Sequence, residues 1–405
     1  MTLALQSFHI SVATLNTKAD ISIQRSNDFA GILGAVSVGA LLILSLALVR
    51  RWSYETFLRT HQILAAVNVY GIFRHLPHNS QFAKVCVYIA LGALALTSSV
   101  QLMVFLYRNG LFAARGCPRA IVHSYGGEVE DDSKEIKDGV VKMCITLPRP
   151  IRVEPGQYIN LWMPTVSLCS WAQTHPFTVV SWSPDPQGTL DLLVKPSGGF
   201  SADIFRHLKP FQKQETSVVF MSFFTGPHGI SKKVNGYESV VVVASGFGIA
   251  AVVPYIRHMI HGYNTCTSQV RRIHLVWQVE SPMGIAVVSE NLLNRLLDDD
   301  IVDKGYILNI SIYQRNGQLL EAKLPVGDKS KVFMYQGSPD YQQMISLETS
   351  GDLIERHSDI PDKCGDALVM VSTTDDVRDQ LREIIRERND TRVNLMELEY
   401  QPSKA

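Results

Sequence analysis

The apolar residues of the chain gather in long runs within its first 110 positions. Phe29 to Val49 contains 21 residues without a charge, and Val85 to Tyr107 contains 23. Each run is long enough to cross the hydrocarbon core of a bilayer as an α-helix. Between them, Phe57 to Phe73 is apolar apart from a few polar residues, which predicts a third span whose polar side chains face protein. The pattern predicts a membrane region of about three helices over residues 29–110.

The charges that flank these runs predict the orientation of the chain. Arg50 and Arg51 follow the first run, and Arg108 follows the last. Because basic loops stay on the cytosolic side, we expect the long segment after Arg108 to lie in the cytosol. Residues 1–28 show neither an apolar helix nor the features of a secretory signal, so they are left unassigned. The sequence therefore predicts a multi-pass membrane protein with a cytosolic C-terminal region.

From residue 119 the pattern changes to short β-rich runs separated by Gly and Pro. Closely spaced runs of this kind favour a small antiparallel β-barrel, expected over residues 119–233. The predicted strands are Val140–Leu147, Gln157–Met163, Phe177–Trp182, Thr189–Lys195 and Ser217–Phe223.

Beyond residue 236, apolar strands alternate with helices, which predicts a doubly wound α/β domain over residues 236–405. The predicted strands are Ser239–Ala244, Ile273–Val279, Leu308–Tyr313 and Ala367–Val371. Helices are expected from the glycine turn after Ala244 through His261 and from Asp375 to Arg388. The polar segment from Pro325 to Cys364 is interpreted as an irregular insertion.

Charge and cysteine usage exclude several classes of function. The formal net charge is zero and the pI is about 7.2, so no basic surface predicts nucleic-acid binding. The six cysteines are scattered singly without a CxxC pair, which argues against a zinc site or an iron–sulfur cluster.

Two glycine-containing turns precede predicted helices and are candidate phosphate sites. The first comprises Lys195, Gly198, Gly199 and Ser201, where backbone N–H groups and a capping hydroxyl can meet an anion at a helix N-terminus. The second is Ser245-Gly246-Phe247-Gly248-Ile249, which follows a buried strand and opens a helix, the order of a dinucleotide-binding βα unit.

His61 and His75 are 14 residues apart, which is close to four helical turns. On one helix their side chains would share a face about 21 Å apart along the axis. That spacing suits two haems stacked across a bilayer. The alternative is that His61 is interfacial and that His75 lies in an outer loop.

Four segments together resemble the fungal ferric and cupric reductases, which are relatives of the NADPH oxidases. They are Glu154–Tyr158, His175-Pro176-Phe177-Thr178, Gly226-Pro227-His228-Gly229, and the stretch from Arg51 to His61. The resemblance implies a ferredoxin-reductase-like arrangement in which the barrel binds FAD and the α/β domain binds NADPH. It also implies a plasma-membrane enzyme that passes electrons to chelated Fe(III) or Cu(II) in metal uptake.

The resemblance also implies roles for individual residues. Thr178 would contact the flavin ring as the catalytic residue, and Arg315 would hold a 2′-phosphate. The FAD set is His175, Pro176, Phe177, Thr178, Lys195, Gly198, Gly199 and Ser201. The NADPH set is Gly226, Pro227, Gly229, Ser245, Gly246, Gly248, Ile249 and Arg315. Glu280, past the second strand of the α/β domain, is the alternative partner for a ribose hydroxyl and would favour NADH.

The chain departs from the family pattern at two places. An earlier helix with its own pair of histidines is missing, so haem b at His61 and His75 would need ligands from an N-terminal piece or from a partner subunit. The family's Cys-Gly-Pro stretch is Ser372-Thr373-Thr374 here. Two alternatives therefore stay open: a haem-free, membrane-tethered FAD and NADPH reductase of a metabolite pathway, and an inactive shortened homologue.

Overall fold

The computed structural model describes residues 26–46, 54–76, 81–110, 113, 116–125, 128–129, 136–137, 139–167, 170–196, 199–208, 217–279, 285–301, 306–315, 323–325, 331–354 and 365–400. The chain divides between Val104 and Phe105 into a helical unit and a larger mixed unit. The barrel and the α/β domain thus belong to one compact unit, and the boundary predicted between them stays a prediction.

The helical unit contains α2 (Ser26–Leu44), α4 (Tyr54–His75) and most of α5 (Gln81–Arg108). Helices α2 and α4 approach closely because small residues line their contact. A Cβ on the buried Gly71 would come within 2.8 Å of the Ala30 carbonyl oxygen. Asn68 Nδ2 donates to the Gly34 carbonyl at 2.9 Å and to Ser37 Oγ at 3.3 Å. The prediction that polar residues of the middle segment face protein is confirmed at Asn68.

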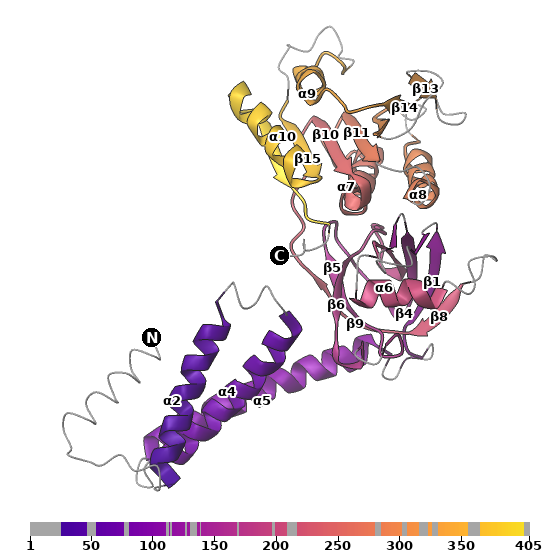
Figure 1. Ribbon diagram of the computed structural model, residues 1–405. Coiled ribbons are helices and arrows are strands. Elements are labelled where there is room, and N and C mark those ends of the chain that lie inside the picture. The colour runs from indigo at the N-terminus through magenta and orange to yellow at the C-terminus, as the bar shows by residue number, and fades with distance from the viewer. Residues whose placement is uncertain are drawn as a thin grey trace. The chain divides into compact units, whose positions relative to one another are not determined.

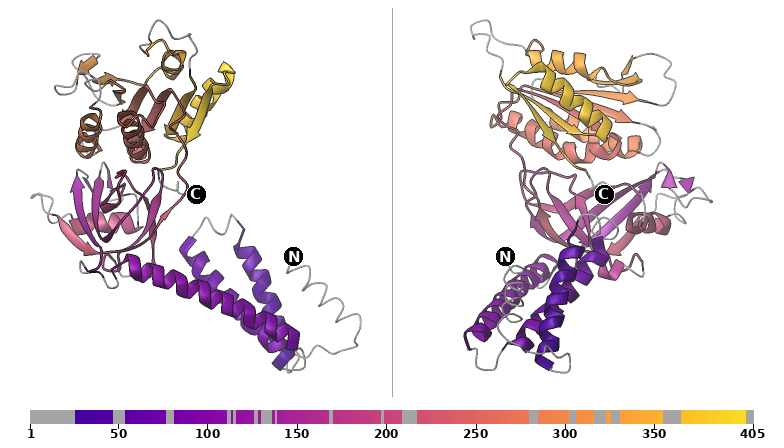
Figure 2. Two further views of the ribbon diagram at one scale, coloured as in Figure 1. Left: turned by 180° about the vertical axis from the view of Figure 1, so that it is seen from behind. Right: turned by 60° about the vertical axis from the view of Figure 1, so that its left-hand side comes forward.

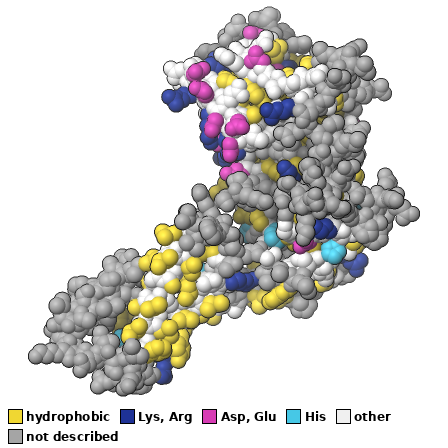
Figure 3. Space-filling model, viewed as in Figure 1, with side chains coloured by type: hydrophobic (Ala, Val, Ile, Leu, Met, Phe, Trp, Pro, Cys, Tyr) yellow, Lys and Arg dark blue, Asp and Glu magenta, His cyan; other side chains and the backbone are white. Residues whose placement is uncertain are grey.

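Among the described residues, α5 is the helix that is long and apolar enough to cross a membrane, and none of its residues is buried. Its hydrophobic side chains are among those exposed on the helical unit in Figure 3. The apolar part of α2, Phe29–Leu44, is shorter, and the end predicted at Val49 lies outside the described residues. All three predicted helices are present, and the three-span topology stays a prediction.

The barrel consists of two antiparallel sheets around one core (Figure 1). One sheet has the order β7-β4-β1-β8 and the other β6-β5-β9, and an isolated bridge joins Val179 to Leu192. The strands are β1 (Arg119–Tyr125), β4 (Val140–Ile151), β5 (Tyr158–Trp162), β6 (His175–Thr178), β7 (Gln187–Val194), β8 (Val218–Met221) and β9 (Phe223–His228); β2 (Glu128–Val129) and β3 (Ile136–Lys137) form a separate hairpin. Helix α6 (Gly199–Leu208) buries its apolar face in the same core. The predicted antiparallel barrel is confirmed.

The α/β part is a seven-stranded sheet with the order β13-β14-β12-β11-β10-β15-β16, parallel except for β13. Its strands are β10 (Ser239–Ser245), β11 (Arg272–Val279), β12 (Leu308–Gln314), β13 (Lys323–Pro325), β14 (Val332–Gln336), β15 (Ala367–Ser372) and β16 (Val393–Glu397). The chain leaves β10 in one direction toward β11 and later returns on its other side as β15. The crevice between the carboxyl ends of β10 and β15 is therefore the topological switch point, where such sheets bind ligands.

Four helices cover the two faces of this sheet (Figure 2). They are α7 (Ile249–Asn264) and α8 (Ile285–Asp299) on one face, and α9 (Tyr341–Ser350) and α10 (Asp375–Arg388) on the other. The middle of strand β10, Val240 to Ala244, is entirely apolar because it is buried on both sides. Val240 and Val242 share a core with α7 and α8, whereas Val241 and Val243 share one with α9 and α10.

One sequence prediction was wrong here. The segment Pro325–Cys364 is not an irregular insertion, because it contains β14 and α9. Helix α9 looks polar in the sequence because two of its four buried residues, Glu348 and Thr349, are polar. The last strand of the sheet is β16 (Val393–Glu397).

A buried ion-pair cluster holds α9 on the sheet. Arg272 at the start of β11 donates to both carboxylate oxygens of Glu348, from Nε at 2.6 Å and from Nη2 at 2.9 Å. His274 Nδ1 lies 2.8 Å from the same carboxylate, and its Nε2 lies 2.8 Å from Ser311 Oγ. Burial opposes the charge of Glu348, but the His274 and Arg272 contacts outweigh it and lower the pKa of Glu348 to about 2.

Candidate flavin and nucleotide site

Strand β6 presents the His-Pro-Phe-Thr segment at the edge of its sheet. It pairs only with β5, with Thr178 opposite Tyr158 and His175 opposite Leu161. An edge strand tolerates Pro176 because the missing N–H faces away from the ladder. Phe177 is buried in the barrel core, while His175 and Thr178 are partly exposed. The strand therefore leaves the side chains of His175 and Thr178 for contacts outside the sheet.

His175 lies against the first turn of α6. Its imidazole stacks on Phe200 with ring centroids 4.3 Å apart, and burial lowers the pKa of His175, which favours the neutral ring. Its Nε2 is buried without a hydrogen-bond partner among the residues that the structure describes. A buried nitrogen of this kind is normally satisfied by a ligand or a water molecule.

The start of α6 also fits a phosphate-bearing ligand. Gly199 begins the helix with φ +53°, and a Cβ there would meet no atom within 4 Å. Ser201 lies inside the first turn rather than before it, which differs from the expected capping position. Lys195 is exposed after β7, and Gly198 lies outside the described residues. The orphaned His175 nitrogen beside an open helix start fits a bound FAD, whose pyrophosphate the helix dipole would favour.

The C-terminal segment covers Thr178. Thr178 Oγ1 donates to the Tyr400 carbonyl at 2.9 Å, and the Tyr400 hydroxyl donates to the Leu193 carbonyl. The Tyr400 ring stacks on Phe247 with centroids 5.8 Å apart. Burial raises the pKa of the Tyr400 phenol. Tyr400 thus contacts strand β6, the end of β7 and the glycine turn after β10.

The turn after β10 lies at the switch point of the sheet. Gly246 has φ +49° and open space where a Cβ would lie, and the Trp277 indole donates to the Gly246 carbonyl at 3.0 Å. Gly248 is packed against β15, because a Cβ there would come within 2.9 Å of the Ser372 carbonyl carbon. Ser245 Oγ accepts from the Thr374 backbone N–H at 3.1 Å. This hydroxyl joins the turn to the segment that replaces the family's Cys-Gly-Pro.

Four other residues predicted for NADPH lie at the start of α7 and in or directly after β9. Ile249 is buried as the first residue of α7. Gly226 and Pro227 lie in β9 and are joined by a cis peptide bond, and Gly226 has φ +118°. Gly229 has φ +94° and lies near Tyr158, the partner of Thr178 in the β5–β6 register.

Arg315 follows β12 at the same edge of the sheet as a group of tyrosines that the sequence analysis missed. Tyr313 and Tyr335 stack with ring centroids 4.9 Å apart, and Tyr341 donates to Gln278 Oε1 at 3.3 Å. Burial and the neighbouring Tyr313 raise the pKa of Tyr341 to about 12, while Arg315 opposes the shift. The sequence carried no clear signal for this group, because Tyr335 lies on β14, inside the segment that was interpreted as irregular, and it is the fold that pairs it with Tyr313. The alternative ribose partner, Glu280, lies outside the described residues.

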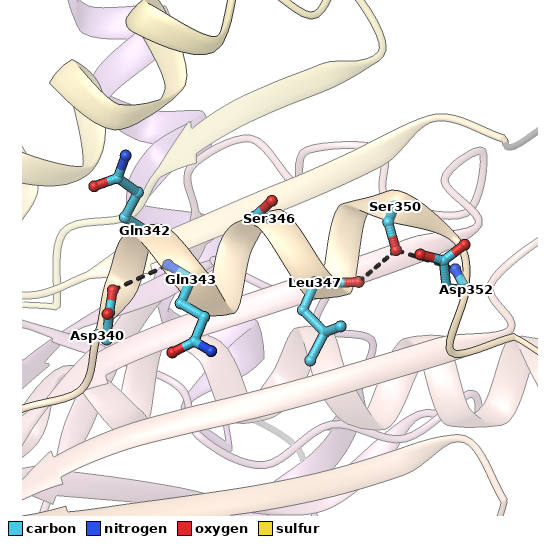
Figure 4. A pocket seen from close by; sticks show the side chains of 7 residues that line it. All are labelled: Asp340, Gln342, Gln343, Ser346, Leu347, Ser350 and Asp352. Carbon is cyan, nitrogen blue, oxygen red and sulfur yellow. Dashed lines mark hydrogen bonds between the residues drawn. The ribbon is translucent and has the colours of Figure 1, made fainter.

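A surface hollow along α9 is separate from these turns. It is lined by Asp340, Gln342, Gln343, Ser346, Leu347, Ser350 and Asp352 (Figure 4). Asp340 caps the helix by accepting from the Gln343 N–H at 3.0 Å. Most of its lining residues are polar in type, and it shares no residue with the flavin strand or the glycine turns.

Three family models match consecutive parts of the chain. A ferric reductase-like transmembrane component matches residues 1–72, an FAD-binding domain matches 132–246, and a ferric reductase NAD binding domain matches 237–393. Together the three matches cover most of the chain and support the ferric reductase family, with an FAD-binding and an NAD-binding domain. FAD and a nicotinamide dinucleotide are therefore the supported cofactors, and the predicted fold class is confirmed.

Two fungal ferric reductases among the curated relatives are much longer than this chain. A probable cell surface ferric reductase of Aspergillus oryzae is 27% identical over 62% of this chain and 32% of its own. Ferric reductase transmembrane component 4 of Saccharomyces cerevisiae is 24% identical over 72% of this chain and 36% of its own. The chain thus spans about a third of the length of these relatives.

Solved structures of related architecture match at low identity. Ferredoxin-NADP+ reductase from Plasmodium falciparum covers 72% of this chain and 99% of its own, with 12% identity and a TM-score of 0.39. Flavohemoglobin from Malassezia yamatoensis covers 97% of this chain and 92% of its own, with 12% identity and a TM-score of 0.41.

The two predicted haem ligands both lie on α4. His61 Nδ1 is buried without a hydrogen-bond partner in the described part of the chain. His75 ends the helix rather than lying in a loop, and its ring lies so close to α2 that a Cβ on Gly31 would be 2.6 Å from His75 Nδ1. About 21 Å of helix separates the two histidines, so one iron cannot take both. The described residues contain no group of three His, Cys, Asp or Glu side chains that could hold a metal ion, and the described residues of the helical unit contain no histidine besides these two. A haem with two histidine ligands does not fit this part of the chain.

Proposed function

We propose that this chain is a membrane-anchored, NADPH-dependent flavin oxidoreductase that reduces chelated Fe(III) or Cu(II) in metal uptake. The observation that carries the proposal is that one compact unit holds both the His175–Thr178 strand and the Ser245–Gly248 turn, joined through Tyr400 and Phe247. The metal acceptors are proposed from the relatives, whose names describe ferric and ferric/cupric reductases.

The chain's own residues supply binding and orientation. FAD, when bound, accepts a hydride from the nicotinamide and releases electrons one at a time. The neutral His175 can hydrogen-bond the cofactor through Nε2, and Thr178 offers a hydroxyl whose position the Tyr400 carbonyl sets. The backbone N–H groups at Gly199 and Gly246 suit the two pyrophosphates, because neither position carries a side chain that would block a phosphate.

The choice of NADPH over NADH is proposed from Arg315 and its neighbours. A guanidinium after the third parallel strand can pair with a 2′-phosphate. The stacked rings of Tyr313 and Tyr335 at the same edge offer an aromatic surface for adenine. Replacing Arg315 with Gln should lower kcat/KM for NADPH by at least tenfold and leave that for NADH nearly unchanged. Equal losses with both nucleotides would argue against a 2′-phosphate contact.

The location is proposed to be the plasma membrane, with α5 as an anchor in contact with lipid and with the mixed unit in the cytosol. The support is the exposed apolar surface of α5 and the cell-surface name of one relative. The predicted positive-inside orientation agrees with a cytosolic source of NADPH.

A second candidate function is a haem-free flavin reductase that serves an acceptor other than a metal chelate. The observation that favours it is the unsuitable arrangement of His61 and His75 described above. A partner subunit that supplies further histidines would restore the first function, and an inactive homologue would bind neither cofactor.

The test uses the full chain purified in detergent. Wild type should retain FAD, lose its yellow colour on anaerobic addition of NADPH, and then reduce Fe(III)-citrate. Thr178→Ala should slow flavin reduction by at least tenfold, whereas the matched control Thr174→Ala, an exposed position just before β6, should not. Gly246→Val should raise the KM for NADPH.

Each alternative has its own result. Flavin reduction without metal reduction would favour the second candidate function. A preparation that stays colourless after FAD is added would contradict both. Paired b-type absorbance bands that disappear in His61→Ala would restore haem ligation.

A further inference from the structure

The last turn of α5 is tied to the barrel by buried hydrogen bonds. Asn109, which is 5% exposed, donates to the Phe224 carbonyl and accepts from the Phe224 N–H, both at 2.8 Å. Arg149 of β4 donates to the Tyr107 carbonyl, and its guanidinium lies 4.0 Å from the centre of the Tyr107 ring. These contacts satisfy groups at the helix end and hold residues 105–109 firmly against β4 and β9.

The length of α5 indicates where this attachment lies relative to a bilayer. The uncharged run from Val85 to Tyr107 is about 34 Å long as a helix, against a hydrocarbon core of roughly 30 Å. Lys84 and Arg108 bound the run, so each is expected at a headgroup layer. Phe105 to Arg108 must then lie at the boundary between hydrocarbon and headgroups.

The barrel surface beside this turn is aromatic and basic. The Phe105 ring centroid lies 6.1 Å from that of Phe223 and 6.5 Å from that of Trp162. The Trp162 indole donates to the Trp171 carbonyl at 3.0 Å, and the Trp171 side chain is 68% exposed. A headgroup layer is roughly 5–7 Å thick, so side chains in direct contact with Phe105 cannot lie far outside it.

The exposed apolar surface continues onto β8. Met221 and Val219 are 46% and 55% exposed, and Met221 is paired in register with Arg119, which is also exposed. Tryptophan and tyrosine concentrate at membrane interfaces because one part of each ring system is apolar and another part forms hydrogen bonds. Arginines in the same place attract anionic headgroups.

We propose that this end of the barrel, which we call the basal surface (Trp162, Trp171, Val219, Met221 and Phe223 with Arg108, Arg119 and Arg149), rests in the anionic headgroup layer of the membrane. The proposal rests on the anchoring role of α5 proposed above. Contact at this surface would restrict rotation of the mixed unit about the end of α5 and fix the height of the barrel above the bilayer. Trp162 lies at one end of β5, and Tyr158, which pairs with Thr178, lies at the other end. Four residues of strand span about 13 Å, so the flavin strand would lie about that much farther from the lipid.

The test measures membrane depth in the full chain. Nitroxide labels are placed at single cysteines, Leu94→Cys in α5, Trp171→Cys and Ile230→Cys, with all six native cysteines replaced by serine. Ile230 is the matched control. It is 90% exposed and lies two residues after His228, which ends β9 and pairs with Tyr158 at the far end of β5 from Trp162. Each variant is reconstituted into vesicles of phosphatidylcholine and phosphatidylserine, and collision rates with oxygen and a water-soluble nickel chelate are compared. We expect the label at 171 to lie at headgroup depth, 94 in hydrocarbon and 230 in water.

The outcomes separate the basal surface from the anchor. The label at 171 could prove as accessible to nickel as the label at 230 while the label at 94 stays in hydrocarbon. That result would refute membrane contact of the basal surface and leave α5 as a span. Nickel access at all three positions would refute the anchor as well. Trp171→Phe with native cysteines provides a second measurement: brominated lipid should quench less of the total fluorescence than in wild type, and equal quenching would also refute the proposal.

Discussion

Removing the charge of Glu348 should destabilise the mixed unit by a predictable amount. Its carboxyl pKa falls from 4.5 to about 2 on folding, and its side chain is 3% exposed. A difference of this size corresponds to about 3 kcal/mol in favour of the folded state at neutral pH. Glu348→Gln should therefore lower the unfolding temperature of the full chain in detergent by about 6 °C or more at pH 7. Glu383→Gln, at an exposed position of α10, is the matched control and should change it little.

The pH dependence gives the sharper test. A depressed pKa means that the unfolded state binds the extra proton, so the stabilisation is complete above pH 4.5 and is lost as the pH falls toward 2. The difference between wild type and Glu348→Gln should shrink over that window, because the variant cannot take up the proton. Intrinsic fluorescence during heating at a series of pH values measures it. A difference that stays constant from pH 7 to pH 3 would refute the ion-pair explanation and point to packing instead.

Three further changes test the close contacts. Gly248→Ala should destabilise the mixed unit by about 1–3 kcal/mol, because the added carbon has no room against β15. Denaturant unfolding should show a larger loss of unfolding free energy than for Gly246→Ala, and equal losses would contradict this explanation. Trp277→Phe should raise the KM for NADPH several-fold, because the Gly246 carbonyl loses its donor, and an unchanged KM would remove the indole from the site. Gly71→Ala should lower the unfolding temperature of the helical unit, whereas Gly39→Ala, with nothing within 4 Å, should not; circular dichroism of the full chain in detergent measures both, and equal behaviour would exclude close packing at Gly71.

The sequence alone was sufficient wherever burial follows a local pattern. Strand β10 is read from a run of β-branched residues because both of its faces are covered. Helix α10 was predicted with its observed bounds, since it begins with two acidic residues and ends with basic ones, as the helix dipole favours. Helix α5 and most of the barrel strands follow from uncharged length and from alternation in the same way.

Tertiary structure decided whatever depends on partners far away in the chain. Helix α9 looks irregular in the sequence because the charge of Glu348 is balanced by Arg272 and His274, which lie 76 and 74 residues earlier. The phosphate turn is completed by a bond between Ser245 and Thr374, 129 residues apart, and Thr178 meets Tyr400 across 222. A linear pattern reports which residues avoid water, because that preference belongs to each side chain. Which polar groups satisfy one another is settled only when the folded chain brings their donors and acceptors within 3 Å or so.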